Sequence, residues 1–307
     1  MNSASKYCRC CIRECRTGSS FCNRIDEAGN LKYKNRFCAI LVDYLFEKPV
    51  LHLTDNVKVL SIGSWGCNLR CLGCQNAKLS WTISGKDLGY VDMGPEEVVE
   101  LAIRNECKGI CYTYNEPAII LEVVEEIASK AKEAGLFNIL VTNSTLTPYS
   151  TKRLAPLMDA IAADIKSMND DFYYGYCGAV GISHVAEKIL ECIQTFHDMS
   201  CHIEVRTNII PCGNDQEKNF CKIARWIRIN LGKNVPWHLT RFFPAHELSN
   251  LPKTPTHTLL HAQQIGFDEK LEYVYTYFNK SCDCAKDKCM IGNNAKPTES
   301  VVESCCK

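Results

Sequence analysis

Three cysteines in the stretch CNLRCLGCQN have the type and spacing of a metal-cluster site. Cys67, Cys71 and Cys74 follow the pattern C-x3-C-x2-C directly after an apolar run. A structural zinc site normally takes four well-marked ligands, whereas the next cysteine here is Cys107, at the far end of a predicted helix. A 4Fe-4S cluster usually takes four thiolates, so three leave one iron open to an exogenous ligand. Because an open metal position is typical of catalytic sites, we predict a catalytic iron-sulfur cluster, with a structural zinc knuckle as the alternative.

Polar residues stand at or just beyond the ends of successive apolar runs. They are Cys67, Glu116, Asn143, Asp164 and Arg206. Parallel α/β sheets and barrels both place their sites at the carboxyl ends of the strands, so this coincidence favours an enzyme. Lys166 follows Asp164 by two residues, which puts both side chains on the same face of a strand. An acidic residue at a strand end also commonly caps a helix, and that is the alternative for Glu116.

These residues require a framework of alternating strands and helices. We predict strands at 57–64, 109–116, 138–144, 160–166, 202–211 and 236–242, because these runs are short, apolar and rich in β-branched or aromatic residues. We predict helices at 94–107, 118–135, 147–157, 181–199 and 215–232. Repeated β-then-α order gives an α/β fold with a parallel sheet, either open or curled into a barrel. Six such units are too few for a complete eight-unit barrel.

The composition is that of an ordinary globular protein. The 307 residues are 46% hydrophobic, and Lys plus Arg and Asp plus Glu both number 35. With equal numbers of both charges, the protein has no net charge that would attract nucleic acid or an anionic membrane. No apolar stretch approaches the length of a membrane span, so we expect neither nucleic acid nor a membrane as a partner. The first residues lack an apolar signal region, which predicts a cytoplasmic protein. Twenty-one cysteines in a reducing compartment argue for bound metal rather than disulfides, and for an anaerobic host.

The cysteines at the two ends of the chain form separate groups. Near the start, C-x2-C-x3-C-x6-C is formed by Cys8, Cys11, Cys15 and Cys22, with Cys10 as an extra thiol. Four thiolates so close together predict a second 4Fe-4S cluster, with zinc or free redox thiols as alternatives. We divide the chain into a cysteine-rich segment at 1–50, a catalytic part at 51–279 and a tail at 280–307. The tail, with Cys282, Cys284 and Cys289, is predicted to be a flexible surface tract.

The C-x3-C-x2-C spacing after a first strand resembles the signature of the radical S-adenosylmethionine (SAM) superfamily. This resemblance implies that Cys67, Cys71 and Cys74 hold a 4Fe-4S cluster whose open iron chelates SAM, and that an electron from the cluster cleaves SAM to a 5'-deoxyadenosyl radical. YTYNEP (112–117), VTNS (141–144) and DIK (164–166) resemble further strand-end elements of the same superfamily. SAM-binding roles are therefore implied for Glu116, Asn143, Asp164, Lys166 and Arg206.

The resemblance extends over about residues 8 to 278. GSWGCNLRCLGCQN, YTYNEPAI, GLFNILVTNS, DDFYYGYCGA, IIPCGND and VPWHLTRFFPAHEL resemble, in this order, radical SAM enzymes of the AmmeMemoRadiSam group, close relatives of pyruvate formate-lyase activating enzyme. Such enzymes are expected to fold as a partial (β/α)6 TIM-type barrel. Two departures stand out. Gly73 replaces an aromatic residue that packs against adenine in many relatives, and Cys212 stands where relatives tend to have Gly.

We predict a radical SAM enzyme, an oxidoreductase that cleaves SAM reductively and abstracts hydrogen from an unidentified peptide or small molecule. An activase that installs a glycyl radical on a partner enzyme is the alternative, and a non-catalytic iron-sulfur carrier or metal-binding scaffold is the alternative of another class. The resemblance also implies a one-electron donor such as flavodoxin or ferredoxin. Asn76, Tyr114 and His238 are predicted to line the pocket. The aromatic run 172–176 either walls the substrate side or is the buried face of a helix.

Overall fold

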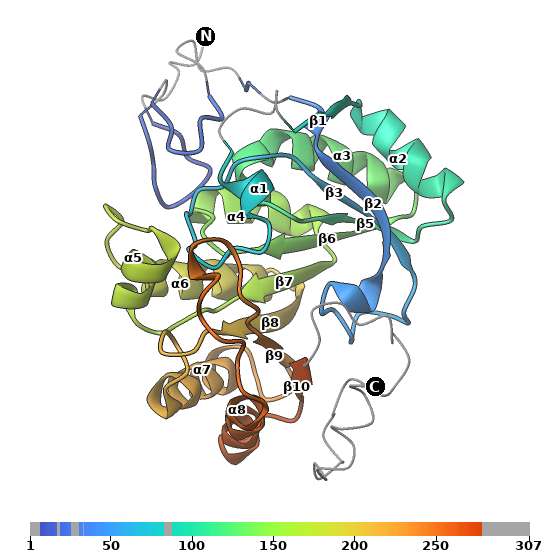
Figure 1. Cartoon of the computed structure of the whole chain (residues 1–307). Coiled ribbons are helices and arrows are strands. Elements are labelled where there is room, and N and C mark those ends of the chain that lie inside the picture. The colour runs from blue at the N-terminus through green and yellow to red at the C-terminus, as the bar shows by residue number, and fades with distance from the viewer. Residues whose placement is uncertain (1–6, 17–18, 26–30, 33, 83–87, 278–307) are drawn as a thin grey trace.

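An eight-stranded mixed sheet forms the centre of the protein (Figure 1). The structure is a computed structural model, and it describes residues 7–16, 19–25, 31–32, 34–82 and 88–277. The strand order is β10-β9-β8-β7-β6-β5-β3-β2, and neighbouring strands are parallel except that β2 pairs antiparallel with β3 at one edge. The strands are β2 (Ala39–Tyr44), β3 (Lys58–Gly63), β5 (Gly109–Tyr112), β6 (Phe137–Thr142), β7 (Ala160–Asp164), β8 (His202–Ile209), β9 (Trp237–Arg241) and β10 (Val274–Tyr277). The predicted parallel α/β sheet is confirmed.

Helices connect the successive parallel strands and cover one face of the sheet (Figure 1). They are α2 (Pro95–Arg104), α3 (Leu121–Glu133), α4 (Pro148–Leu154), α5 (Asp170–Cys177), α6 (Val185–Asp198), α7 (Glu217–Asn230) and α8 (Thr256–Asp268). The short elements are α1 (Ala77–Ser80) and the 3₁₀ turns η1 (Leu45–Glu47), η3 (Pro117–Ile120), η4 (Ala155–Leu157) and η5 (His246–Leu248). Local sequence fixes the ends: α2 begins at Pro95, and the Glu97 side chain accepts a hydrogen bond of 2.6 Å from the Gly94 amide.

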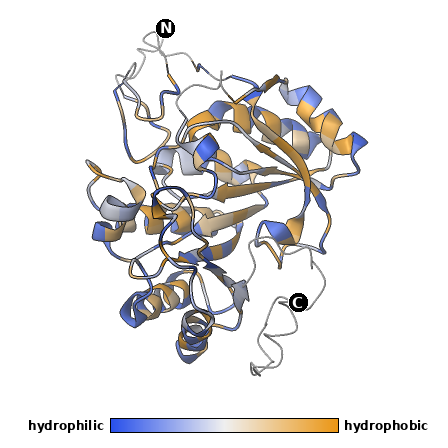
Figure 2. Cartoon of the chain, in the orientation of Figure 1, coloured by the Kyte–Doolittle hydropathy of each residue, from blue (hydrophilic) through white to orange (hydrophobic). Residues whose placement is uncertain are grey.

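The two faces of the sheet bury different sets of residues. The larger core lies between the sheet and the helices, and Figure 2 shows hydrophobic residues running along the central strands. A smaller core on the other face combines Val59, Cys111, Ile139 and Ala162 with Leu45 from η1. The amide of Leu45 donates to the carbonyl of Val57 at 2.9 Å, so η1 lies at the amino end of β3, and the carboxyl ends of the parallel strands point away from it.

Several elements lie outside the sequence-based expectations. β2 falls within residues 1–50, which we assigned to a cysteine-rich segment, β10 and α8 had no predicted counterpart, and α5 was anticipated only as one alternative for the aromatic run. Residues Arg36–Phe37 (β1) and Val91–Asp92 (β4) form a separate two-stranded ribbon. The tail at 280–307, predicted to be a flexible surface tract, lies outside the described residues. In the part of the chain that the structure describes, no helix is both long enough and apolar enough to cross a membrane.

Candidate active site

The loop after β3 carries the three cysteines of the C-x3-C-x2-C motif, and hydrogen-bond donors face two of their sulfurs. The amide of Leu69 lies 3.4 Å from the Sγ of Cys67, and Nδ2 of Asn143 lies 3.8 Å from the same sulfur. The Sγ of Cys74 lies 3.1 Å from the hydroxyl of Ser80. Burial raises the pKa of Cys67 and Cys74, and a cationic metal bound to the sulfurs would favour the thiolates. Soft sulfur donors with amide groups directed at them suit an iron-sulfur cluster.

The carboxyl end of α5 holds this loop in place. The amide of Arg70 donates to the carbonyl of Cys177 at 2.8 Å, and the amide of Leu72 donates to the carbonyl of Tyr176 at 2.8 Å. Gly178 follows in the left-handed region, with φ of 61°, and a Cβ atom there would lie 2.9 Å from the Cβ of Arg70. The carboxyl end of α5 therefore contacts the cluster loop on both sides of Cys71.

This contact brings a fourth thiol to the site that sequence analysis did not find. The neighbouring thiol of Cys177 and burial together raise the pKa of Cys71. Cys177 is buried, with 2% of its surface exposed. It is separated from the motif by several strand-helix units of the barrel, so no cysteine spacing in the sequence could have indicated the contact.

Asp164, Lys166 and Arg206 form a charged triplet at the carboxyl ends of β7 and β8. Oδ2 of Asp164 accepts from Nζ of Lys166 at 2.6 Å, and Oδ1 accepts from the Arg206 guanidinium at 2.5 and 2.9 Å. Burial acts to raise the pKa of Asp164, but the charges of Arg206 and Lys166 outweigh it and lower the pKa. Two cations share one carboxylate, so the triplet carries an excess positive charge that a ligand carboxylate can neutralise.

Glu116 holds the ends of β5 and β6 together. Its carboxylate accepts from the amide of Ala118 at 3.1 Å, from the Thr142 hydroxyl at 2.8 Å and from the amide of Asn143 at 2.8 Å. Burial raises the pKa of Glu116 to about 7, although these three hydrogen bonds favour the carboxylate. The residue caps η3, the alternative that its position allowed, and it also fixes the backbone from which Asn143 reaches Cys67.

The three predicted pocket residues fall into two places. Nδ2 of the exposed Asn76 donates to the carbonyl of Tyr114 at 2.9 Å, which joins the cluster loop to the end of β5. His238 is the cross-strand neighbour of Arg206, but none of its surface is exposed. Its Nε2 lies 2.7 Å from the buried carboxylate of Glu204, and its Nδ1 lies 2.9 Å from the hydroxyl of Tyr277. His238 thus belongs to the closed interior of the barrel.

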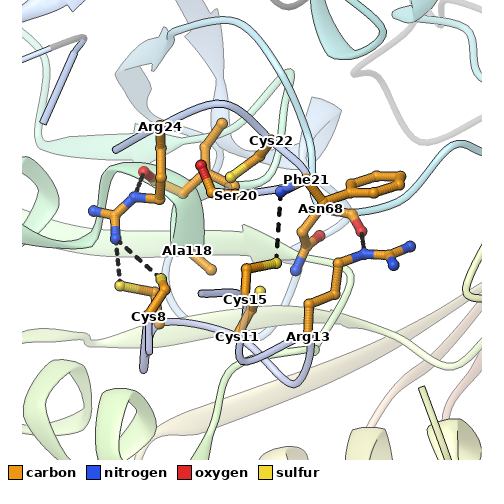
Figure 3. Close-up of a pocket in the computed structure, with 12 residues that line it drawn as sticks. Cys8, Cys11, Arg13, Cys15, Ser20, Phe21, Cys22, Arg24, Asn68 and Ala118 are labelled. Carbon is orange, nitrogen blue, oxygen red and sulfur yellow. Dashed lines mark hydrogen bonds between the residues drawn. The ribbon is translucent and has the colours of Figure 1, made fainter. Parts of the chain in front are cut away.

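Five cysteines of the N-terminal segment line one small cavity (Figure 3). They are Cys8, Cys10, Cys11, Cys15 and Cys22. The buried Arg24 directs its guanidinium to the Sγ of Cys10 at 2.6 Å and of Cys8 at 3.6 Å, and also binds Glu122 and the carbonyl of Ile119. Cys10, the thiol outside the predicted spacing, therefore belongs to the group. Among the described residues, no three His, Cys, Asp or Glu side chains are arranged around a single metal ion.

Asn68 joins this cavity to the cluster loop. It lines the cavity together with Cys11, and its Oδ1 accepts from Nδ2 of Asn143 at 2.9 Å and faces the Sγ of Cys67 at 3.8 Å. Arg13 adds a second link, because its guanidinium binds the carbonyls of both Asn68 and Gly178. The cysteine-rich segment is thus packed directly against the C-x3-C-x2-C loop.

The aromatic run on α5 serves mainly as its buried face. Phe172 and Tyr173 are buried, and the Tyr173 hydroxyl accepts from the amides of Lys166 at 3.1 Å and Ser167 at 3.3 Å. The Tyr176 ring stacks on Phe172 with the centroids 5.0 Å apart. The two rings also line a cleft of about 670 Å³ between α5 and the start of α7. The run therefore positions the DIK segment and, at its outer edge, borders an open cleft.

The turn after β8 explains one departure from the relatives. Cys212 is exposed and has a φ of 60°, in the left-handed region that favours glycine, and its amide donates to Asp215 at 3.0 Å. Glycine at this position would adopt the same conformation without strain.

Comparison with known proteins identifies the family. Residues 62–227 match the model of the radical SAM superfamily. An uncharacterized protein of Methanocaldococcus jannaschii is 35% identical over 277 residues, which cover 87% of this chain and 80% of that protein. Pyruvate formate-lyase 1-activating enzyme of Escherichia coli is 25% identical over 186 residues, covering 60% of this chain and 72% of the enzyme. A radical SAM methyltransferase from Sphaerobacter thermophilus superposes with a TM-score of 0.56 at 14% identity, over 77% of this chain and 70% of that structure.

The chain belongs to the radical SAM superfamily. It is a radical SAM enzyme with the superfamily's partial TIM-type barrel, and membership implies a 4Fe-4S cluster and SAM. The predicted relationship to pyruvate formate-lyase activating enzyme is confirmed. The non-catalytic carrier or scaffold is no longer a candidate.

Proposed function

We propose that this enzyme cleaves SAM reductively at a 4Fe-4S cluster held by Cys67, Cys71 and Cys74, and that it abstracts hydrogen from a peptide, protein or small-molecule substrate. Bound cluster and SAM supply the radical chemistry, and the protein supplies binding, orientation and electrostatics. The observation that carries the proposal is the placement of three thiols at the carboxyl end of β3, with Asn143 directed at Cys67.

The charged triplet supports a binding site for the methionine part of SAM. This part carries a carboxylate and an ammonium group. The excess positive charge of Lys166 and Arg206 suits the carboxylate. The partly exposed Asp164 can accept a further hydrogen bond from the ammonium group through the remaining lone pairs of its oxygens. Asn143 presents its side-chain amide to the cluster loop, at Cys67 and Asn68. Glu116, whose carboxylate is occupied by Ala118, Thr142 and Asn143, contributes by fixing Asn143.

Two substrate classes remain candidates, and a specific observation favours each. The 25% identity to an enzyme named for activating pyruvate formate-lyase supports a protein substrate, in which a backbone glycine would lose hydrogen. The cysteine-rich segment packed on the cluster loop supports modification of a peptide or small molecule, since a minimal activase needs no such segment. A one-electron donor such as flavodoxin or ferredoxin would reduce the cluster in either case. We favour modification, because this segment is joined to the catalytic loop itself.

The test is anaerobic turnover. Protein reconstituted with iron and sulfide is mixed with dithionite and SAM, and 5'-deoxyadenosine is measured by chromatography. We expect wild type and the control Cys107→Ala to form it, since Cys107 is buried away from the loop, whereas Cys67→Ala, Cys71→Ala and Cys74→Ala form none. Turnover retained in any one of these three variants would overturn the cluster assignment. Methylthioadenosine in place of 5'-deoxyadenosine would show cleavage of a different carbon-sulfur bond.

A further inference from the structure

Two arginines contact an exposed aromatic ring of the N-terminal segment. The guanidinium of Arg13 lies over the ring of Phe21, 3.6 Å from its centroid, and that of Arg70 lies 4.7 Å from the same centroid. Arg13 also donates to the carbonyl of Val180 at 3.3 Å, in the segment that follows α5. Phe21 is 37% exposed and Val180 is 71% exposed. We call these four residues the arginine patch, and Figure 3 shows Arg13 and Phe21 on the side of the cavity away from Arg24.

The positive charge of the arginine patch is not balanced by a carboxylate. The acceptors of the two guanidiniums are all main-chain carbonyls, those of Asn68, Gly178 and Val180 for Arg13 and those of Cys67, Leu69 and Ser80 for Arg70. In the described part of the chain, no carboxylate accepts from either arginine. Glu14 and Arg16, the charged neighbours of Arg13 in the sequence, are exposed and opposite in charge, so they add no net charge. The surface therefore combines two cations with two exposed apolar side chains.

The arginine patch is attached to the loop that carries the proposed cluster ligands. Arg70 lies between Cys67 and Cys71 in the sequence, and Arg13 is bound to the main chain of the same loop at Asn68. The charged triplet proposed for SAM lies at the ends of β7 and β8, and none of the patch residues belongs to it. An electron donor must dock near the cluster that it reduces, and this surface meets that requirement.

We propose that the arginine patch is the docking surface for an acidic one-electron carrier protein, which reduces the cluster. The inference rests on the proposed function, because it requires a cluster on this loop. Complexes between redox proteins are small, so a surface of a few residues can form the centre of one. Arginine and aromatic side chains are enriched at interfaces, and the unbalanced positive charge steers an acidic partner toward the loop. One electron passes from the carrier, which is oxidised, to the cluster, which is reduced.

The test changes the charge of the patch at Val180, because Arg13 and Arg70 also hold main-chain carbonyls in place. Arg13 binds the carbonyl of Val180, so Val180→Glu and Val180→Lys alter only an exposed side chain. Ile103→Glu is the matched control, since Ile103 is 52% exposed on α2 and belongs to neither the patch nor the cluster loop. The reconstituted full-length proteins are mixed anaerobically with reduced flavodoxin. Stopped-flow absorbance gives the second-order rate constant of cluster reduction at low and at high ionic strength.

The sign of the added charge should decide the rate. At low ionic strength, we expect Val180→Glu to slow reduction by flavodoxin about two- to fivefold and Val180→Lys to accelerate it by a similar factor, the usual effect of one exposed charge. High ionic strength should diminish both differences, because salt screens exposed charges. Ile103→Glu should match wild type. Photoreduced deazaflavin, a small reductant without a protein surface, should reduce all four proteins at equal rates.

Three results would overturn the inference. Equal rate constants with flavodoxin in wild type and both Val180 variants would place the docking surface elsewhere. Failure of flavodoxin to reduce wild type would exclude an acidic carrier of this kind. Slower reduction of Val180→Glu by photoreduced deazaflavin as well would show that the substitution acts on the cluster rather than on docking.

Formation of 5'-deoxyadenosine by wild type, reduced with deazaflavin, separates this inference from the proposed function. Absence of both product and cluster signal would defeat the proposed function and the docking surface together. Product formation with flavodoxin rates that do not respond to the charge at Val180 would defeat the docking surface alone.

Discussion

A Cβ atom on Gly73 would lie 2.8 Å from the ring of Phe242, so the cluster loop can approach the end of β9 only with glycine at this position. Phe242 is fully buried, and its amide donates a hydrogen bond of 2.8 Å to the hydroxyl of Thr254. An aromatic side chain at position 73 has no room here, because the Phe242 ring occupies the space.

Gly73→Ala should therefore destabilise the protein by about 1–3 kcal/mol, the usual cost of overpacking, and weaken retention of iron. Thermal unfolding followed by circular dichroism and iron analysis after gel filtration measure the two effects. Phe242→Leu added to Gly73→Ala should recover part of the loss, because it removes the atoms nearest to the new methyl group.

Gly175→Ala is the matched control for that experiment. Gly175 lies in α5, and the methyl group that alanine would add there meets no atom within 4 Å, so the substitution should be neutral or slightly stabilising. An unchanged unfolding temperature in Gly73→Ala would show that the loop moves away from Phe242 at little cost.

Lys166→Met should weaken the binding of SAM by roughly tenfold or more, the cost of one charge-assisted hydrogen bond. Asp164 keeps its pair with Arg206 at 2.5 Å, so the fold should survive. Equilibrium dialysis of SAM against the reconstituted protein measures the affinity, with the exposed Lys222→Met as the control. An unchanged affinity for SAM would show that Lys166 only pairs with Asp164 and does not contact SAM.

The N-terminal cysteines give a prediction about iron content. If the cavity of Figure 3 holds a second 4Fe-4S cluster, reconstituted wild type should bind about twice the iron of a variant with Cys8→Ala, Cys11→Ala and Cys15→Ala. Iron, sulfide and zinc are measured on the same samples. Equal iron in the two proteins would exclude a second iron-sulfur cluster, and zinc lost only from the variant would identify the alternative metal.

Glu204 predicts a specific dependence of stability on pH. Burial acts to raise its pKa, but hydrogen bonds from His202, His238 and the amide of His52 outweigh burial and lower the pKa to about 2 from 4.5. Because the folded-state pKa is the lower one, this stabilisation is fully present above about pH 4.5 and is lost as the pH falls toward about 2. At about 1.4 kcal/mol per pKa unit, it is on the order of 3 kcal/mol.

Urea unfolding between pH 7 and pH 3 measures this contribution. Glu204→Gln should be less stable than wild type at pH 7, and the difference should shrink as the pH falls. Glu100→Gln, on the exposed side of α2, should follow the wild-type curve. A difference between wild type and Glu204→Gln that stays constant down to pH 3 would show that packing, rather than the charge of Glu204, is responsible.

Local pattern was sufficient for the central six strands and for the order of the motifs along them. Short apolar runs in the sequence correctly predicted β3 and β5 to β9, because a strand buried on both faces must be short and apolar. The edge strands β2 and β10 were harder to recognise. Only one neighbour pairs with each, and β2 is largely exposed, so their sequences need not be uniformly apolar.

The sequence by itself determined the superfamily, the parallel sheet and the residues at the strand ends, because these depend on spacing and periodicity along the chain. Only the tertiary structure decided which residues far apart in the sequence come into contact. Cys177 lies against Cys71, Phe242 lies beside Gly73, and Asn68 lies between the N-terminal thiols and Cys67. Such contacts join residues far apart in sequence. They arise because α5, the loop after β9 and the N-terminal segment all pack at the carboxyl ends of the parallel strands. No local sequence pattern indicates such contacts.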